Sequence, residues 1–566
     1  MTWLVAVVLA ASACASDAPT ALPDPAATSS TSGPGTAAPS PTPAACVAAA
    51  ASPPAGRWWD DRVFYEVFVR SFADSNGDGT GDLRGLIDHL DYLNDGNPAT
   101  GDDLGITGIW LMPVAEAASY HGYDVVDYRA VERDYGTVED FRDLMAAAHE
   151  RGIAVIVDLV LNHTSVEHPW FQDSRTPGSM HADWYLWSDT NPGYAGPDGQ
   201  QVWHADGGRF YYGLFWEGMP DLNLATPAVA AELDGVARYW LRDLGVDGFR
   251  LDAIKHFVEE GRDQENTAAS RAWLAGFHDR VRAATPDALL VGEVFDLTRV
   301  SSSYVPAAVD LTFDFELAGK ILLGARIGEA ASLASAQRDA LKLYADGAYG
   351  AFLTNHDQAR VMTELNDLAA ARAAASVLLT NPGVPFIFYG EELGMEGGKP
   401  DERIRTPMPW NATAPGFGFT TGTPWEVLEP GWETANVEDL AADGASLLSH
   451  YRSLIGVRAA HPSLRTGSFV PLRSAAPTVY AFLAKRADDT VVVVVNLGPE
   501  DVTGYDLSLT TGEACGVTRA RTVYADGIVL TPDAAAPVVT VGGTFTGWQP
   551  VPMLPARATL VIALDD

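Results

Sequence analysis

The stretch Gly248-Phe249-Arg250-Leu251-Asp252-Ala253-Ile254-Lys255-His256 joins a short apolar strand pattern to a dense set of polar side chains. Residues two apart on a β-strand point to the same side, so Arg250 and Asp252 are expected to share one face. A cation beside a carboxylate keeps that carboxylate ionised. Asp252 is therefore a candidate nucleophile at the end of a strand, and a structural Arg–Asp ion pair is the alternative interpretation.

Seven further apolar runs share the chain with this one, and amphipathic helical patterns lie between them. Apolar strands that alternate with helices predict a parallel sheet covered on both faces. Eight strand–helix units predict an α/β fold, a (β/α)8 TIM barrel, whose active site lies at the C-terminal ends of the strands. The predicted strands are 63–68, 106–112, 153–161, 246–251, 289–294, 309–315, 351–353 and 384–389, and the clearest helical patterns are 138–151, 228–244, 269–284 and 333–345.

Four of these predicted strands end in polar or ionisable residues. The C-terminal ends of parallel barrel strands meet at one rim, so these side chains are expected to converge. Convergence from four strands favours an active site over four separate structural contacts. The residues are Asp158, Asn162 and His163 after the third run, Arg250 and Asp252 after the fourth, Glu293 after the fifth, and Asn355, His356 and Asp357 after the seventh.

These groups lie in four sequence blocks, 158–163, 248–256, 292–295 and 352–357. The blocks, in this order and spacing, resemble the α-amylase family, the family 13 glycoside hydrolases. The resemblance covers about residues 58–457 and implies a TIM barrel with an inserted domain B and a C-terminal antiparallel β-sandwich. The implied boundaries are 57–163 and 222–457 for the catalytic barrel, 164–221 for domain B and 458–566 for the β-sandwich.

The resemblance also implies roles for individual residues. Asp252 looks like the nucleophile, Glu293 like the general acid/base, and Asp357 like the carboxylate that binds sugar hydroxyls and stabilises the transition state. Glycoside cleavage with retention needs one carboxylate to attack and one carboxylic acid to protonate the leaving oxygen. The negative charges of Asp252 and Asp357 are expected to raise the pKa of Glu293. The implied substrate-binding residues are His121, Tyr123, His163, Arg250, Lys255, His256, His356 and Arg360.

A loop after the first predicted strand, Asp74-Ser75-Asn76-Gly77-Asp78-Gly79-Thr80-Gly81-Asp82, has the alternating oxygen donors and turn glycines of a calcium site. It matches a calcium loop in oligo-1,6-glucosidase-like family members, which implies a structural Ca²⁺. The implied ligands are the side chains of Asp74, Asn76, Asp78 and Asp82 and the carbonyl of Thr80. An ordinary Gly/Asp turn is the alternative. A second calcium site beside domain B could use Asn162 and His256.

The 58 residues of the predicted domain B are too many for a simple connection. They are rich in aromatic residues, which could stack on sugars or form the small domain's own core, and the core is the favoured interpretation for most of them. The residues are Trp170, Trp184, Tyr185, Trp187, Trp203, Tyr211, Tyr212 and Trp216.

The N-terminus is predicted to be a targeting segment. Residues 1–13 form a short apolar signal, and Ala11-Ser12-Ala13 before Cys14 resembles a bacterial lipoprotein cleavage site. Residues 14–56, rich in Ala, Pro, Ser and Thr, read as a disordered tether. We therefore expect an exported protein, anchored to the membrane by lipid on Cys14 or otherwise secreted. Cys46 and Cys515 could form a disulfide in an oxidising compartment.

The net charge of −37 argues against nucleic acid as a partner and fits a neutral substrate, although an acidic surface can serve solubility alone. Residues 219–223 (MPDLN), 120–123 (YHGY) and 386–392 (FIFYGEE) resemble lipoprotein-type α-amylases intermediate between oligo-1,6-glucosidases and neopullulanases. We expect a monomer that cleaves α-1,4 bonds in starch and maltooligosaccharides. The alternatives are an exo-acting α-glucosidase, a transglycosylase such as a trehalose synthase, and, more remotely, a non-catalytic glucan-binding lipoprotein.

Overall fold

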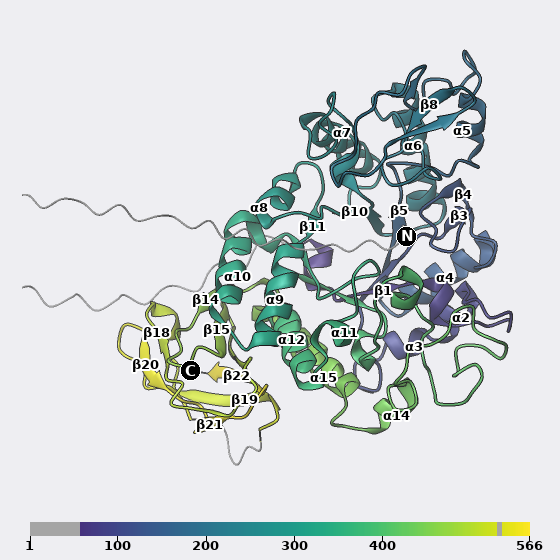
Figure 1. Ribbon diagram of the computed structural model, residues 1–566. Helices are drawn as coiled ribbons and strands as arrows, with labels where there is room; N and C mark the ends of the chain where they lie inside the picture. Colours follow the sequence, from purple (N-terminus) through teal and green to yellow (C-terminus); the bar gives the residue numbers. More distant parts are fainter. Residues whose placement is uncertain (1–56, 529–534, 566) are drawn as a thin grey trace, which may run out of the picture. The chain divides into compact units, whose positions relative to one another are not determined.

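The computed structural model describes residues 57–528 and 535–565. Eight parallel strands close into a barrel (Figure 1), which confirms the predicted fold class. Seven of these strands fall within the predicted runs. Around the barrel the strands are β1 (Phe64–Val67), β2 (Gly108–Leu111), β5 (Ala154–Leu159), β9 (Gly248–Leu251), β10 (Leu289–Gly292), β11 (Leu311–Phe313), β12 (Tyr349–Ala351) and β13 (Val384–Phe388).

The seventh strand was predicted two residues too late. The prediction was 351–353, whereas β12 spans Tyr349–Ala351. Phe352 lies beyond the strand, and its ring packs edge-on against Phe313 and Phe315, with centroid distances of 5.5 and 4.9 Å. The apolar run therefore reflects aromatic packing at the barrel rim rather than strand pairing.

Alternation along the strands divides the barrel interior from the helical layer. The rings of Phe64 and Phe386 stack inside the barrel at 4.7 Å, while Tyr65, between Phe64 and Glu66, joins the core outside it. Strands β5 and β9 pair in parallel with Asp158 opposite Arg250. The apolar interior thus gives way to a polar layer as the strands approach their C-terminal ends.

Helices follow the strands and cover the barrel. Helix α4 begins with a capping box in which Thr137 accepts from the Asp140 amide and Asp140 accepts from the Thr137 amide. The predicted helix 228–244 is α6 (Pro227–Arg238) continued by a π-helical turn, η2 (Tyr239–Asp243). The other helices are α1 (Val69–Phe72), α2 (Leu83–Asp88), α3 (Leu90–Leu93), α4 (Val138–Glu150), α5 (Pro169–Ser174), α7 (Ala268–Ala284), α8 (Thr298–Ser301), α9 (Phe315–Ile327), α10 (Ala331–Leu343), α11 (Val361–Leu365), α12 (Leu368–Thr380), α13 (Asp401–Ile404), α14 (Val437–Ala442), α15 (Leu447–Ala460) and α16 (Pro462–Thr466).

Domain B leaves and rejoins the barrel at one point. His163 and Asp221 form an isolated antiparallel bridge, which brings the two ends of the insertion together. Inside it, β6 (Trp187–Ser188), β8 (Arg209–Tyr212) and β7 (Trp203–Asp206) form a small antiparallel sheet. Seven of the eight predicted aromatic residues are buried or half-buried, whereas Trp216 is 48% exposed. The core interpretation therefore holds for all but Trp216.

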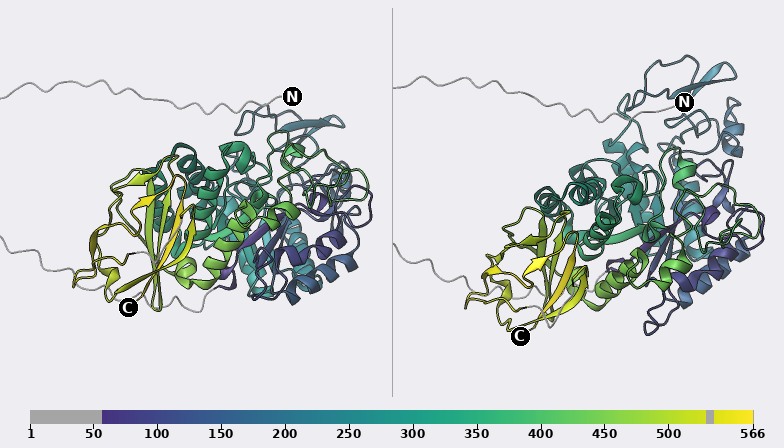
Figure 2. Two further views of the ribbon diagram at one scale, coloured as in Figure 1. Left: turned by 90° about the horizontal axis from the view of Figure 1, so that it is seen from below. Right: turned by 60° about the horizontal axis from the view of Figure 1, so that its bottom comes forward.

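The C-terminal region contains antiparallel sheets, drawn in yellow in Figures 1 and 2. Its main sheet has five strands in the order β14 (Ser468–Pro471), β15 (Val479–Arg486), β16 (Asp489–Asn496), β22 (Thr559–Asp565) and β19 (Arg519–Asp526). Tyr480 and Phe482 on one face join the core shared with the barrel helices. Leu483 and Val492 on the other face pack with the residues of β18 (Leu507–Leu509) and β20 (Phe545–Trp548). A further pair joins β17 (Val502–Thr503) to β21 (Met553–Leu554), and β3 (Ala115–Ala117) pairs with β4 (Val125–Val131) beside the barrel.

The predicted start of the C-terminal domain, residue 458, falls inside α15. Arg458 is 1% exposed and donates to the carbonyls of Leu379, Asn381, Leu464 and Gly383. It therefore fastens α15 to the barrel. The C-terminal sheet begins ten residues later, at Ser468.

Several predictions concern residues outside the described ranges. These are the signal 1–13, the tether 14–56, lipidation of Cys14 and the pairing of Cys46 with Cys515, and they stay predictions. Across residues 57–528 and 535–565, no helix combines the length and the hydropathy that crossing a membrane requires.

Candidate active site

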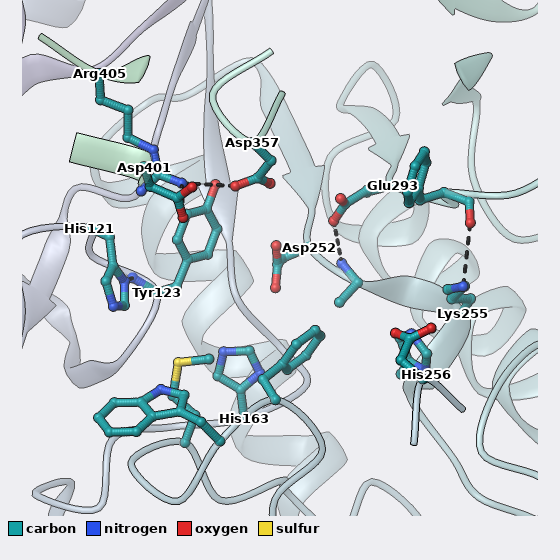
Figure 3. Close-up of a pocket in the computed structure, with 16 residues that line it drawn as sticks. His121, Tyr123, His163, Asp252, Lys255, His256, Glu293, Asp357, Asp401 and Arg405 are labelled. Carbon is teal, nitrogen blue, oxygen red and sulfur yellow. Dashed lines mark hydrogen bonds and ion pairs between the residues drawn. The ribbon is translucent and has the colours of Figure 1, made fainter. Parts of the chain in front are cut away.

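A pocket of about 440 Å³ opens where the barrel strands end (Figure 3). Loops of the barrel and the end of domain B both contribute to its wall. It contains the three predicted catalytic carboxylates and five of the eight predicted substrate-binding residues. The lining residues are His121, Tyr123, His163, Asp198, Phe215, Trp216, Met219, Asp252, Ala253, Lys255, His256, Glu293, Phe295, Asp357, Asp401 and Arg405.

Arg250, on β9, lies beneath this pocket and is fully buried. Its Nη1 donates to Asp252 Oδ1 at 2.7 Å and to Asp158 Oδ2 at 2.8 Å, and its Nη2 lies 2.6 Å from Glu293 Oε2. One guanidinium thus forms ion pairs with three carboxylates from the ends of three strands. Asp252 and Arg250 do share one face, as the strand alternation predicts.

Burial and the Arg250 charge act in opposite directions on the pKa values of Asp252 and Glu293. Burial raises the pKa of Asp252, attraction to Arg250 lowers it, and the balance is a pKa of about 6. Burial also raises the pKa of Glu293, with the Arg250 charge opposing and the Asp252 and Asp357 charges adding to the rise. At neutral pH Asp252 is therefore mostly ionised, as a nucleophile must be, and the pKa of Glu293 is shifted in the direction that a general acid requires.

The backbone after Asp252 also fixes Glu293. Ala253 adopts a left-handed conformation, with φ of 49°, which turns the chain sharply at the end of β9. Its amide donates to Glu293 Oε2 at 2.9 Å. Glu293 Oε2 thus receives both this amide and Arg250, so the Glu293 carboxyl is oriented relative to Asp252.

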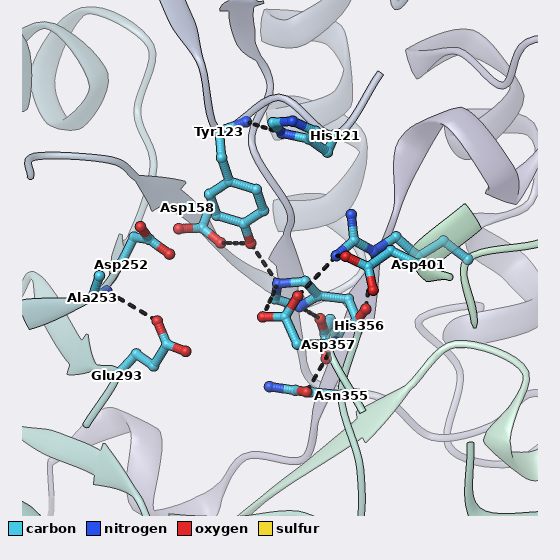
Figure 4. A network of polar contacts seen from close by, with 12 residues as sticks. His121, Tyr123, Asp158, Asp252, Ala253, Glu293, Asn355, His356, Asp357 and Asp401 are labelled. Carbon is cyan, nitrogen blue, oxygen red and sulfur yellow. Dashed lines mark hydrogen bonds and ion pairs between the residues drawn. The ribbon is translucent and has the colours of Figure 1, made fainter. Parts of the chain in front are cut away.

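Asp357 has a different environment from the other two carboxylates (Figure 4). His356 Nε2 lies 3.1 Å from its Oδ2, and Arg405 Nη2 lies 2.8 Å from its Oδ1. Enclosure in the pocket raises the pKa of Asp357, but attraction to His356, Arg405 and Arg250 outweighs it and holds that pKa well below its usual range. Asp357 therefore stays ionised, as a group that stabilises positive charge must.

The aromatic and histidine residues form the wall around these carboxylates. Tyr123 donates its hydroxyl hydrogen to Asp158 Oδ2 at 2.9 Å, and its ring stacks on His356 at 5.5 Å. Burial lowers the pKa of His163 to about 3, so its ring is neutral. Its Nε2 has no partner in the described part of the chain. His163 lines the pocket, although Nε2 itself is buried.

Lys255 and His256 line the opposite side, near Glu293. Lys255 Nζ pairs with Glu265 at 2.8 Å and donates to the Phe295 carbonyl at 3.3 Å. His256 Nδ1 lies 2.9 Å from the Gln264 carbonyl. Both side chains are thus held by the loop before α7 while they face the pocket.

The structure contradicts a substrate-binding role for Arg360. Its side chain is 1% exposed and donates to the carbonyls of Ile404 and Tyr389. The guanidinium also lies over the Phe388 ring, 4.3 Å from its centroid. Arg360 therefore faces away from the pocket and fastens the loop after β13, whereas the neighbouring His356 is buried against the pocket floor.

Several pocket residues were not predicted. Arg405 and Asp401 come from the long loop after β13, where Arg405 Nη2 lies 3.4 Å from Asp401 Oδ2. Met219 also lines the pocket. It lies in the segment 219–223 (MPDLN), which served to compare subfamilies, but no binding role was predicted for any residue of that segment. The remaining unpredicted residues are Asp198, Phe215, Ala253 and Phe295, whereas Trp216 was among the aromatic residues predicted either to stack on sugars or to form the core of domain B. An isolated cation or aromatic residue in an aperiodic loop gives no local signal of its position.

The loop 74–82 is wound into successive side-chain turns. Asp74 accepts from the amides of Gly77 and Gly79, Asn76 from that of Asp78, and Asp78 from that of Thr80. Oxygens of this kind are what Ca²⁺ prefers. Among the described residues, however, no three His, Cys, Asp or Glu side chains come together as a metal site. Of the two residues proposed for a second calcium site, Asn162 donates to Asp221 at 2.9 Å and His256 Nδ1 lies 2.9 Å from the Gln264 carbonyl.

Together these features define an enzyme that works with carboxylates on a barrel scaffold. Two carboxyl groups whose pKa is raised by burial and one carboxylate whose pKa is lowered meet in a pocket walled by aromatic rings. That set matches the demands of glycoside cleavage through an oxocarbenium-like state. The site is that of a glycosidase.

Comparison with known proteins agrees with this assignment. Residues 66–467 match the alpha amylase catalytic domain. Alpha-amylase 3 of Dictyoglomus thermophilum is 38% identical over 78% of this chain and 85% of its own length. The trehalose synthase/amylase TreS of Mycobacterium tuberculosis is 34% identical over 79% of this chain and 83% of its own. The crystal structure of alpha-amylase from H. orenii, 38% identical, superposes with a TM-score of 0.77 over 89% of this chain and 99% of that one.

The chain belongs to the α-amylase family of glycoside hydrolases. Oligo-1,6-glucosidases are among its relatives too, at 30% identity over 78% of this chain and 90% of that of Parageobacillus thermoglucosidasius. Membership of the α-amylase family therefore defines the type of reaction, but it does not define which glucan this enzyme cleaves.

Proposed function

We propose that this enzyme is an α-amylase that hydrolyses internal α-1,4-glucosidic bonds of starch and maltooligosaccharides with retention of configuration. Asp252 attacks the anomeric carbon while Glu293 protonates the leaving oxygen, which gives a covalent glycosyl-enzyme. Glu293 then takes a proton from water as that water attacks the same carbon and releases Asp252. Asp357 stabilises the positive charge that develops on the sugar ring.

The observation that carries this proposal is the sharing of Arg250 by Asp252 and Glu293. Two carboxyl groups on one guanidinium are close together, and a close pair is the arrangement of retaining rather than inverting enzymes. The ring walls of the pocket, with Tyr123 on one side and the exposed Phe295 on the other, suit a sugar chain.

Product analysis on maltoheptaose tests the proposal. Endo action gives mixed short maltooligosaccharides from the first minutes, and proton NMR shows them first as the α-anomer. Release of glucose alone, or products of β-configuration, would contradict the proposal. Glu293→Gln, which keeps the shape of the side chain but cannot exchange a proton, is the matched inactive control.

A transglycosylase is the second candidate, because TreS is 34% identical to this chain. The segment Asn355-His356-Asp357-Gln358, followed by Arg360, also resembles α-glucosidases. Incubation with maltose distinguishes them. An amylase leaves maltose largely intact, an α-glucosidase yields glucose, and a trehalose synthase yields a non-reducing disaccharide.

We also propose that the loop 74–82 binds a structural Ca²⁺ through Asp74, Asn76, Asp78, Asp82 and the Thr80 carbonyl. The support is the kind of donor atoms present and the turned backbone, with Gly77 at φ of 84° and Gly79 at φ of 98°. Thermal unfolding with and without EDTA tests the proposal, and an unchanged midpoint would contradict it.

We propose further that the protein is exported and carries lipid on Cys14, on the sequence pattern of residues 1–14. Mass spectrometry of the N-terminal peptide from membrane and medium fractions tests this. A diacylated cysteine supports anchoring, whereas an unmodified Ala15 or Cys14 terminus in the medium supports secretion without an anchor.

A further inference from the structure

Glu66 is a buried carboxylate near the C-terminal end of β1. The proposed reaction assigns it no role. Its side chain is 2% exposed and points into the barrel. Its Oε1 lies 2.5 Å from Nδ1 of His356, the histidine that carries Asp357 on its other nitrogen. An ionisable group buried this deeply is costly unless it is paired with a partner of opposite charge.

The ring of His356 has an acidic oxygen at each end. Nδ1 faces Glu66, and Nε2 lies 3.1 Å from Asp357 Oδ2 and 2.7 Å from the Tyr123 hydroxyl. A neutral imidazole has a single N–H, so it would turn a lone pair toward one of the two carboxylates. Only the doubly protonated ring donates to both. Since Tyr123 donates to Asp158, its oxygen is free to accept from Nε2.

We propose that Glu66 is a positioning residue of the active site, which holds His356 as a doubly protonated ring so that Nε2 donates to Asp357 and Tyr123. The proposal rests on the proposed function, because it matters only if Asp357 and Tyr123 take part in the reaction. Glu66 itself does not line the pocket, so it acts through His356 alone.

The surroundings of His356 leave few other groups that could hold its charge. Trp110 packs edge-on against the ring at 5.6 Å and supplies no anion. Burial lowers the pKa of His356, but Asp357 and Glu66 outweigh it and bring the pKa to about 9. The ionisable groups around the ring are Glu66 on β1, Tyr123 after β2, Asp158 on β5, Asp357 in its own loop, and the cations Arg250 and Arg405.

The test compares Glu66→Gln with the wild type by measuring kcat/KM on maltoheptaose between pH 5 and pH 9. The amide keeps an acceptor for Nδ1 but removes the charge, so His356 loses its second proton at lower pH. The ratio of variant to wild-type kcat/KM should therefore fall ~fivefold or more as pH rises from 6 to 9, if loss of the Glu66 charge lowers the pKa of His356 from about 9 by one unit or more. Titration of Glu293 affects both enzymes and cancels in this ratio.

Two variants sharpen the comparison. Glu66→Asp keeps the charge on a shorter stem and should give a flatter ratio than Glu66→Gln. Glu392→Gln is the matched control, because Glu392 is also buried and accepts from Tyr65, next to Glu66, but does not touch His356. The ratio of Glu392→Gln to wild-type kcat/KM should not vary with pH. A pH-independent ratio for Glu66→Gln would overturn the proposal and leave Glu66 a packing residue.

A second arm covers the case in which Glu66→Gln folds poorly. If Glu66 acts only through His356, then adding Glu66→Gln to His356→Asn should change kcat/KM less than ~2-fold, as coupled residues do. The double variant should also unfold at a higher temperature than His356→Asn, because Glu66→Gln removes a buried carboxylate that has lost its histidine partner. A further loss of both activity and stability would contradict the proposal. Failure of the wild type to cleave any α-glucan would instead overturn the proposed function.

Discussion

Arg250 and Glu293 are joined by a contact of 2.6 Å between Nη2 and Oε2, although one lies on β9 and the other just after β10. The same guanidinium holds Asp252 through Nη1. Glu293 and Asp252, the proposed acid/base and nucleophile, therefore share one cation, and their relative position depends on a fully buried side chain.

Replacing Arg250 by lysine should disable the enzyme without removing the positive charge. A single ammonium cannot reproduce the fork that reaches Asp252, Asp158 and Glu293 together. We expect kcat/KM to fall ~10²–10³-fold, as when one preorganised donor is lost. The measurement is steady-state hydrolysis of maltoheptaose, with Arg84→Lys on the exposed surface as the control.

The acidic limb of the same variant's pH profile should also move. Arg250 lowers the pKa of Asp252 against the effect of burial, so weaker contact leaves that pKa higher. Asp252 attacks only when ionised, and the limb at low pH must therefore shift to higher pH. An unchanged limb would mean that Arg250 does not control ionisation of the nucleophile.

Asp252→Asn should abolish turnover while leaving the pocket intact. The amide keeps an oxygen for Arg250 Nη1 but cannot form the covalent glycosyl intermediate. We expect a loss of ~10⁴-fold or more in kcat, as for removal of a nucleophile. Calorimetry should still detect maltoheptaose binding. Near-wild-type activity in this variant would refute the assignment of Asp252.

The sequence predicted the elements that carry regular patterns and missed those that do not. Asp252 and Glu293 follow directly after apolar strands, and a polar residue that ends an apolar strand pattern can be recognised in the sequence. Arg405 reaches the pocket from the long loop after β13, where no regular sequence pattern indicates its position. Arg360, three residues beyond Asp357, was predicted to bind substrate because of its neighbours in sequence, but the chain turns there and buries its guanidinium.

Glu391→Gln should change stability rather than activity. Glu391 is 5% exposed, accepts from the Tyr451 hydroxyl at 2.7 Å, and has its pKa raised by burial to about 8. The folded state therefore keeps this proton while the unfolded chain releases it near its ordinary pKa of 4.5. The folded state binds more protons between these values, so the free energy of unfolding falls as pH rises through that window.

The neutral glutamine removes this dependence. The midpoint of thermal unfolding should exceed that of the wild type by ~2–4 °C at pH 8, with a smaller difference at pH 5. The exposed Glu438→Gln is the control. A difference that does not grow with pH would show that Glu391 is ionised in the folded protein.

The loop 74–82 offers a substitution that separates the proposed metal binding from folding. Asp78 accepts from the Thr80 amide at 2.8 Å through Oδ1, and an asparagine oxygen can make the same bond. Asp78→Asn therefore removes one negative charge and keeps the turn. If the loop binds Ca²⁺, the wild type should unfold at a higher temperature with Ca²⁺ than with EDTA, and the variant should need more Ca²⁺ to reach the same midpoint.

In EDTA the two proteins should unfold at the same temperature, because the turn itself is unchanged. The loop packs on residues 419–424, where Asp74 donates its amide to the Phe419 carbonyl and accepts from the Thr420 hydroxyl. A bound cation would thus strengthen the junction between the loops after β1 and β13. Equal midpoints with and without Ca²⁺ in the wild type would show that the turn is complete without a metal.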